Sequence, residues 1–173
     1  MTNRMLRYLL VVASIVIGMF ALITPKPIDN ESEFSAERAF DHIEQIAKVP
    51  HTIEDKDALE DVREYLVSQL NILGVQNEIT TYTQEDDEYD IAEVNNILVT
   101  IPGESDSYIL LVAHYDSSPA KRIGEETGSL GAADDGYGLS TILETLNVLL
   151  KNNVELNNGI KVLFSDAEEI GLY

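Results

Sequence analysis

The sequence contains no cysteine, so disulfides and thiolate metal sites are excluded. Any metal must be bound by nitrogen and oxygen ligands. Basic charge is scarce as well, because 11 Lys and Arg residues stand against 31 Asp and Glu residues, for a net charge of −20. Such a chain repels phosphate backbones, which argues against nucleic acid as a partner. It also concentrates cations near its surface, although solubility is the commoner reason for an acidic surface.

Acidic residues are also missing from the amino-terminal segment, where none precedes Asp29. Residues 8–24 carry no charge, residues 9–23 are almost wholly apolar, and Arg4 and Arg7 come before them. A helix of this length nearly spans a bilayer core, which takes about 17–25 residues. We therefore expect a membrane anchor over residues 1–24, with its amino terminus cytoplasmic and the body on the extracytoplasmic side. A cleaved signal peptide, which would make the protein secreted, is the main alternative, and a buried core helix is the lesser one.

Residues 25–35 are predicted to form a short acidic linker, and residues 36–173 to form one domain. The chain is 45% apolar, which is enough to bury a core. Helical spacing of apolar residues predicts a helix from Ala36 to near Val49, and a second from the caps at Thr52 and Asp55 to the stop at Gly74. Both helices are expected to cover a sheet.

Four strands are predicted over residues 75–83, 91–101, 108–113 and 160–164. The first two flank a polar segment at 85–90 that is typical of a solvated hairpin tip, since it lacks the spacing of a calcium loop. The last two are continuous apolar runs of the kind buried on both faces, and a helix ending at Lys151 joins them. Strand, helix and strand predict a parallel crossover and an α/β fold. We expect a three-layer sandwich with a mixed, mostly parallel sheet.

Polar clusters follow the last two strands and open the helix between them. Ligands of α/β sheets bind beyond the carboxyl ends of the strands, so these clusters should face one crevice. An imidazole with several carboxylates suits zinc, manganese or cobalt. A bridging Asp and a basic Glu would then support metal-assisted hydrolysis. The residues concerned are His114, Asp116, Asp134, Asp135, Asp166, Glu168 and Glu169.

Each of these signals has a commoner structural explanation when it occurs alone. A single His at a strand end is more often structural or solvated, and paired acids in a first helical turn usually act as caps or dipole complements. Their joint occurrence in one crossover unit favours the metal site. A serine triad made of His114, Asp116 and Ser117 fails, because the chain has no Gly-x-Ser-x-Gly elbow.

Three motifs occur in order: His-Tyr-Asp-Ser at 114–117, Gly-Ala-Ala-Asp-Asp-Gly-Tyr-Gly at 131–138, and Phe-Ser-Asp-Ala-Glu-Glu-Ile-Gly-Leu-Tyr at 164–173. Together they resemble the co-catalytic zinc aminopeptidases of the aminopeptidase Y and bacterial leucyl aminopeptidase type. The likeness is greatest to the membrane-anchored endoplasmic-reticulum metallopeptidase branch. It is strong over residues 95–173 and weaker over residues 36–74. It implies an enzyme that hydrolyses amino-terminal residues from peptides.

The resemblance also implies a role for each matching residue. His114 would bind the first of two zinc ions, Asp134 would bridge both, and Glu169 would bind the second. Glu168 would be the general base, and Asp116 would orient the imidazole of His114. The peptide bond that follows the bridging Asp is often cis in this family.

The family takes a further Asp and a distant His from regions after the Glu-Glu motif, and this sequence has neither. We therefore expect a truncated catalytic domain that binds zinc weakly and turns over little substrate. His42 and His51 lie on the wrong side of the sheet order and are not expected to replace the missing ligand. Two alternatives are a non-catalytic membrane-anchored fragment or metal-binding module, and a glutaminyl cyclase-like acyltransferase, which uses a similar sheet with one zinc.

Overall fold

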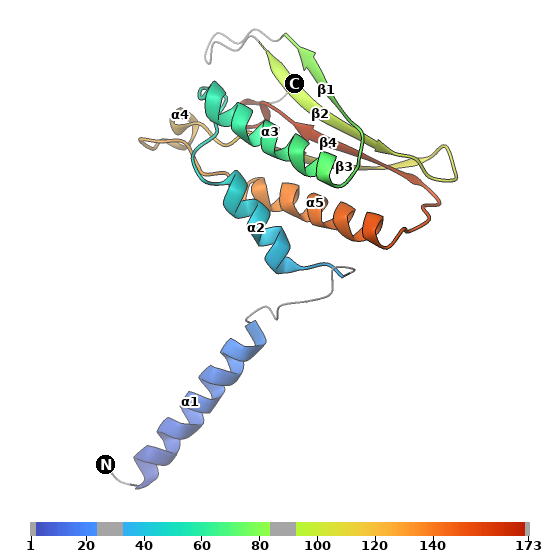
Figure 1. Cartoon of the computed structure of the whole chain (residues 1–173). Helices are drawn as coiled ribbons and strands as arrows, with labels where there is room; N and C mark the ends of the chain where they lie inside the picture. The colour runs from blue at the N-terminus through green and yellow to red at the C-terminus, as the bar shows by residue number, and fades with distance from the viewer. Residues whose placement is uncertain (1–2, 24–32, 84–92, 172–173) are drawn as a thin grey trace.

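The computed structural model describes residues 3–23, 33–83 and 93–171 (Figure 1). Its elements are, in order, α1 (Asn3–Ile23), α2 (Ala36–Ile46), α3 (Lys56–Ile72), β1 (Asn77–Tyr82), β2 (Val94–Ile101), β3 (Tyr108–His114), α4 (Ala120–Ile123), α5 (Gly136–Lys151), β4 (Gly159–Ser165) and the 3-10 turn η1 (Glu168–Ile170). The helices and strands predicted after residue 36 are thereby confirmed. The predicted hairpin tip at 85–90 and most of the predicted linker lie outside the described residues.

The sheet has the order β1-β2-β4-β3 and is mixed, as the sequence predicts. Strand β3 pairs in parallel with β4, which confirms the crossover through α5. The pairings of β1 with β2 and of β2 with β4 are antiparallel. The prediction of a mostly parallel sheet is therefore wrong for the described strands, because β2 returns from the hairpin and runs against β4.

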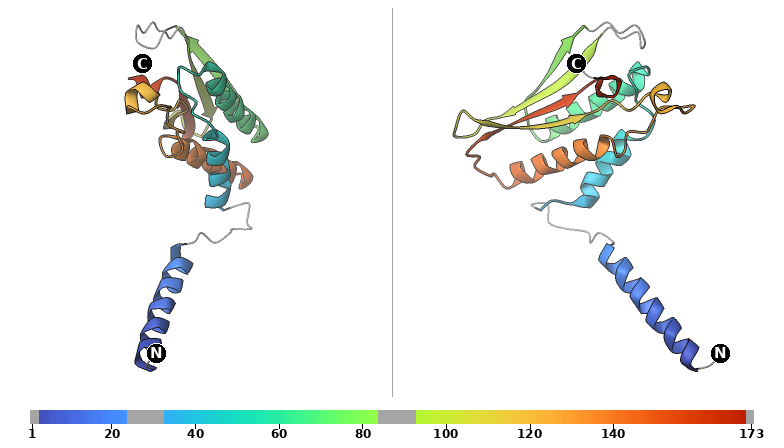
Figure 2. Two further views of the ribbon diagram at one scale, coloured as in Figure 1. Left: turned by 90° about the vertical axis from the view of Figure 1, so that its left-hand side faces the viewer. Right: turned by 180° about the vertical axis from the view of Figure 1, so that it is seen from behind.

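The core lies between this sheet and the helices that cover it. Ile97 and Phe164, which face each other across β2 and β4, are both fully buried. They share one apolar cluster with Leu66 of α3 and Leu143 of α5. Figure 1 shows α3 in front of the strands, and the view from behind in Figure 2 shows the strands in front of α3. Burial of each such leucine contributes about 2 kcal/mol to folding.

Strand β3 is not buried on both faces, although its continuous apolar run predicts this. Ile109, Leu110 and Val112 are 55%, 56% and 55% exposed. Strand β3 lies at one end of the sheet order, and the described helices pack on one face of the sheet only. The described part of the chain therefore forms two layers, and the predicted third layer is not among its elements. An apolar run cannot distinguish a central strand from an apolar edge strand.

Helix α2 is tied to α5 by a buried ion pair. Glu144 is 1% exposed and accepts hydrogen bonds from Nη2 of Arg38 at 2.6 Å and from the backbone N–H of Ser35 at 2.9 Å. Burial alone would raise the pKa of Glu144, but these hydrogen bonds outweigh it and lower the pKa. The pair therefore fixes the start of α2 against the middle of α5.

Helix α1 covers most of the predicted anchor. Its described apolar side chains are solvent-exposed, and Leu10 is 60% exposed. The side chains of residues 17–23 lie outside the described ones. Within the part of the chain that the structure describes, no helix has both the length and the hydrophobicity that crossing a bilayer takes. The predicted membrane-spanning helix is thus not confirmed.

Candidate metal site

The carboxyl ends of β3 and β4 lie side by side at one edge of the sheet. Their parallel register pairs His114 with Ser165, and the backbone N–H of Tyr115 donates to the carbonyl of Ser165 at 2.9 Å. The chain then leaves β4 through Ala167, whose φ is 63°, and enters η1, which begins with Glu168. The turn after each strand thus carries site residues to the same edge.

Three predicted metal ligands meet at this edge. His114, Asp134 and Glu169 each offer a ligand atom, and these atoms all lie within 4.8 Å of one another. Nε2 of His114 lies 3.0 Å from Oδ1 of Asp134 and 3.8 Å from Oε2 of Glu168, the predicted base. One imidazole nitrogen and two carboxylates form a donor set that fits zinc. The side chain of Asp134 is 81% exposed, so the cluster opens to solvent.

Asp116 connects the two strand ends. It is 1% exposed, and its Oδ1 and Oδ2 accept hydrogen bonds from the backbone N–H groups of Glu168 and Glu169, each at 3.0 Å. Its Oδ1 also lies 3.4 Å from Nδ1 of His114, and its carbonyl oxygen lies 3.0 Å from the same nitrogen. A proton on Nδ1 leaves Nε2 to face the other ligands. The sequence predicts a contact between Asp116 and His114, but not the bonds to the Glu-Glu backbone.

The charges of the cluster alter its pKa values. Burial disfavours charge on His114, but hydrogen bonds to Asp116 and Asp134 outweigh burial and raise the pKa of His114 to about 10. Burial raises the pKa of Glu169, which a hydrogen bond from Ser118 partly offsets. Metal binding requires a deprotonated Nε2 and an ionised carboxylate, so protons and metal compete for this site.

The turn before α5 positions Asp134. Its peptide bond to Asp135 is cis, as the family resemblance implies. Asp135 does not join the ligand cluster; it caps α5, and its Oδ1 accepts the backbone N–H of Gly138 at 3.0 Å. A Cβ atom at Gly138 would lie 2.3 Å from that same Oδ1. A side chain at position 138 would therefore displace the Asp135 carboxylate from its present place.

Two neighbours of Glu169 were not predicted from the sequence. Nε of Arg122, in α4, lies 3.6 Å from Oε2 of Glu169. The Ser118 hydroxyl is the second neighbour. Arg122 is one of the few basic residues, and it lies in the sequence between two motifs that carry candidate ligands. This position could have indicated that Arg122 lies near the site. No motif marks Ser118 in the same way.

Asp166 and His51 lie close to the site but outside the ligand cluster. Oδ2 of Asp166 accepts the backbone N–H of Asn95 in β2 at 2.9 Å, and its buried Oδ1 has no hydrogen-bond partner among the described residues. Burial raises the pKa of Asp166 to about 6. His51 is bonded to Ser117, directly behind the His114 segment. His51 was not expected to replace a missing ligand, and it is not in the ligand cluster, although the α2–α3 connection brings it beside the site.

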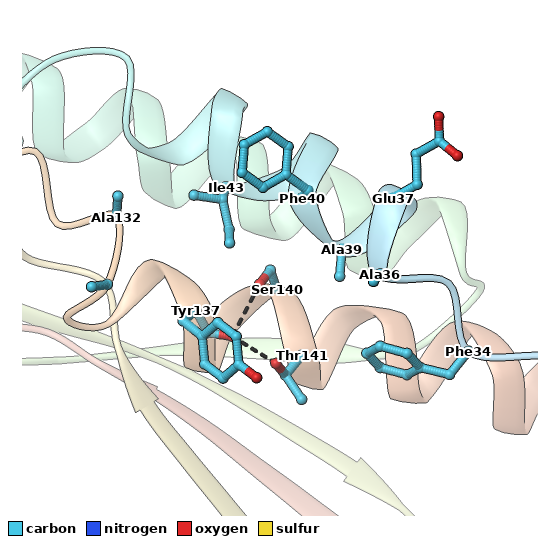
Figure 3. Close-up of a pocket in the computed structure, with 11 residues that line it drawn as sticks. Phe34, Ala36, Glu37, Ala39, Phe40, Ile43, Ala132, Tyr137, Ser140 and Thr141 are labelled. Atoms are coloured by element: carbon cyan, nitrogen blue, oxygen red, sulfur yellow. Dashed lines mark hydrogen bonds between the residues drawn. The ribbon is translucent and has the colours of Figure 1, made fainter. Parts of the chain in front are cut away.

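An apolar groove of about 770 Å³ lies between α2 and the start of α5 (Figure 3). Phe34 and Phe40 project into it from the α2 side and Tyr137 from α5. One end is lined by Ala133, the residue before Asp134. Glu37 is the only charged side chain among the described residues that line it, so the groove adds no metal ligands of its own.

Proteins with known names are similar to parts of this chain. Residues 96–173 match the model of a family described as Peptidase family M28. A vacuolar membrane protease of Candida dubliniensis is 32% identical over 142 residues, which cover 76% of this chain and 14% of that protein. Leucine aminopeptidase 1 of Pyrenophora teres f. teres is 43% identical over 86 residues, or 45% of this chain and 21% of that protein. The chain thus spans a small part of the curated relatives it matches.

Solved structures share its fold. A Zn-dependent exopeptidase from Parabacteroides distasonis superposes with a TM-score of 0.69 at 26% identity, over 79% of this chain and 48% of that chain. A glutaminyl cyclase from Bacteroides thetaiotaomicron gives the same TM-score at 24% identity over the same shares, which shows the fold alone. The matched region contains all five predicted site residues, from His114 to Glu169. Residues 96–173 are therefore similar to peptidase family M28.

Proposed function

We propose that this chain supplies part of the active site of a zinc metallopeptidase, an aminopeptidase that removes amino-terminal residues from peptides. The convergence of His114, Asp134 and Glu169 within 4.8 Å carries the proposal, because three separate segments deliver one donor set to the strand ends. The family match supports peptide hydrolysis, and the relative named leucine aminopeptidase 1 supports the choice of the amino terminus.

Each ligand has a proposed role. His114 would hold the first zinc through Nε2, Glu169 would hold the second, and the exposed carboxylate of Asp134 would serve both. When bound, two such zinc ions lower the pKa of a water molecule between them and polarise the carbonyl group of the peptide bond that is cleaved. The residues present fit this group, since they offer nitrogen and oxygen donors and an open side toward solvent.

Glu168 is the proposed general base. Its side chain is 49% exposed and faces Nε2 of His114 at 3.8 Å, so its carboxylate can take the proton of the attacking water and pass it to the leaving amine. Asp116 keeps the proton of His114 on Nδ1 and holds the backbone of Glu168. Of the two adjacent glutamates, Glu168 would thereby act as the base and Glu169 as a metal ligand.

Zinc titration of the 173-residue chain tests the site directly. We expect weak binding, because the cluster offers three ligand residues and one of them is largely exposed. His114→Ala should remove the tightest part of this binding, whereas His42→Ala should leave it unchanged, because His42 lies on α2 beside Tyr65. Equal loss in both variants, or tight binding that persists without His114, would contradict the proposed site.

Substitution of the base separates catalysis from simple metal binding. In the whole protein, Glu168→Gln should lower leucyl-p-nitroanilide hydrolysis by about a hundredfold or more while zinc binding persists. If the protein is instead a non-catalytic metal-binding module, the wild type itself should show no hydrolysis, and the substitution should change nothing. Unchanged hydrolysis in Glu168→Gln would show that another group is the base.

Glutaminyl cyclisation is the second candidate function, because a glutaminyl cyclase shares the fold. An assay of peptides that begin with Gln or with Leu distinguishes the two reactions. Release of a free amino acid from the Leu peptide supports the aminopeptidase. Formation of pyroglutamate without hydrolysis supports the cyclase.

Membrane attachment through residues 1–24 is a separate part of the proposal. Arg4 and Arg7 precede the charge-free residues 8–24, the described apolar side chains of α1 are exposed, and one relative is named a vacuolar membrane protease. The amino terminus would be cytoplasmic and the body extracytoplasmic. The expressed chain should sediment with membranes after alkaline extraction, and deletion of residues 1–24 should release it. Recovery of the intact chain in the soluble fraction would contradict attachment, and a new amino terminus near residue 24 would identify a signal peptide.

A further inference from the structure

His51 lies in the α2–α3 connection and is 1% exposed, which is unusual for a side chain that no helix or strand holds. Its Nδ1 lies 3.0 Å from the carbonyl oxygen of Val49. Burial lowers the pKa of His51, so the neutral imidazole is the folded form. A neutral ring with its proton on Nδ1 satisfies that carbonyl and keeps a fixed orientation.

His51 and Ser117 form a reciprocal pair of hydrogen bonds. The backbone N–H of His51 donates to Oγ of Ser117 at 3.0 Å, and the backbone N–H of Ser117 donates to the carbonyl of His51 at 3.1 Å. Ser117 follows Asp116 directly and is fully buried. The segment 114–118, which carries one metal ligand and its orienting acid, therefore rests on the residue at position 51.

The imidazole of His51 also contacts the turn that carries Asp134. A Cβ atom at Gly131 would lie 3.0 Å from Nε2 of His51 and 3.0 Å from Cβ of Ser117. The ring thus packs against the backbone at Gly131, and the carbonyl of Gly131 accepts the backbone N–H of Gly136 at 2.8 Å to close the turn. His51 thus touches both segments that must converge, the first through its backbone and the second through its ring.

We propose that His51 is a positioning residue for the metal site. Its backbone is hydrogen-bonded to Ser117 and its buried ring packs against the turn 131–136, so together they set the separation that places Nε2 of His114 3.0 Å from Asp134. This inference rests on the proposed function only in its consequence for metal binding. The contacts that carry it come from the protein alone, and no ligand role for His51 is involved.

The test compares substitutions of two buried or half-buried histidines. His51→Ala removes the ring, and His51→Asn keeps a donor for the Val49 carbonyl but does not reach Gly131. His42→Ala and His42→Asn are the matched controls. His42 is also hydrogen-bonded, with Nδ1 2.7 Å from the Tyr65 hydroxyl, but it belongs to α2 and its partner belongs to α3. Amide hydrogen exchange of the metal-free full chain, zinc affinity and the free energy of unfolding are measured for each variant.

Both His51 variants should accelerate exchange in residues 131–136 more than in the rest of the sheet, and in residues 114–118 to a smaller extent, because the hydrogen bonds to Ser117 come from the backbone at position 51. They should weaken zinc affinity by about ten- to a hundredfold, the range found when the support of a metal ligand is lost. His51→Asn should affect residues 131–136 more than residues 114–118, because only its contact with Gly131 is lost. The His42 variants should change neither property, even where they reduce the free energy of unfolding equally.

Two results separate this inference from the proposed function. If wild-type protein binds no zinc but exchange at the two segments still rises in the His51 variants, the metal proposal fails and the positioning role stands. If zinc binds to the wild type and the His51 variants change exchange and affinity no more than the His42 variants do, the positioning role is wrong.

Discussion

The carboxylate of Asp116 shows how a single buried side chain organises the site. It receives two backbone N–H groups from η1 and faces the imidazole of His114, so the strand ends of β3 and β4 are held through it. A carboxylate is needed, because it offers acceptors in two directions and no donor. The two glutamates depend on Asp116 for their backbone positions as much as on β4.

Asp116→Asn should reduce the free energy of unfolding by about 2–3 kcal/mol. The amide would turn its NH₂ group toward one of the N–H groups of η1, which would then be buried without an acceptor. Urea unfolding of the metal-free chain measures the change. Asp55→Asn is the control, because Asp55 also accepts a backbone N–H, at the start of α3, and Asn caps helices equally well. Equal effects in the two variants would contradict the account of Asp116.

Asp166 gives a prediction of pH dependence. The pKa of Asp166 is raised from 3.8 to about 6 in the folded state, so the folded protein keeps the carboxyl proton up to a higher pH than the unfolded chain does. The stability from this group is fully present below pH 3.8 and is lost as the pH rises to about 6. The loss is up to about 3 kcal/mol, at 1.36 kcal/mol per unit of pKa.

Asp166→Asn should remove that part of the pH dependence. The free energy of unfolding of the variant, relative to wild type, should therefore rise between pH 4 and pH 7, as measured by urea unfolding at a series of pH values. Asp106→Asn, at an exposed position, is the control. A difference between variant and wild type that stays constant across this range would show that Asp166 is not protonated in the fold.

Helices α2 and α5 form a pair whose contact depends on charge. Glu144→Gln should lower the free energy of unfolding by about 2–4 kcal/mol, because a neutral amide replaces the buried carboxylate that faces Arg38. Exposed Glu37, on the first turn of α2, provides the control Glu37→Gln. Thermal and urea unfolding measure both variants. A loss of less than about 0.5 kcal/mol in Glu144→Gln would show that packing alone joins the helices.

The elements differ in how far the sequence predicted them. Local signals fixed the bounds of α3, where Asp55 caps the helix and Gly74 follows it with a φ of 72°. The segments that carry the three candidate ligands were predicted to converge because each lies at a strand end or a helix start of one crossover, and the ligand roles followed from the family resemblance. Exposure of β3 was not predicted, because it depends on which strand lies beside it in the sheet. The place of His51 was missed for a similar reason, since the path of the α2–α3 connection is a tertiary property.

At the scale of the whole molecule, net charge and exposed apolar surface stand out. A net charge of −20 raises the concentration of cations near the chain. Added salt screens the charge and weakens this attraction. The exposed side chains of β3 and the groove beside α2 are surfaces that this part of the chain leaves uncovered. The acidic surface also provides many weak alternative sites for zinc, so binding by itself does not locate the site.

Anomalous diffraction at the zinc edge, from crystals of the chain soaked with zinc, tests the central claim most directly. The account predicts the strongest anomalous peak within about 2.0–2.2 Å of Nε2 of His114 and of a carboxylate oxygen from Asp134 or Glu169. Crystals of His114→Ala should lose that peak and keep any weaker surface peaks. A strongest peak on surface carboxylates away from these three residues, in the wild-type crystals, would contradict the account.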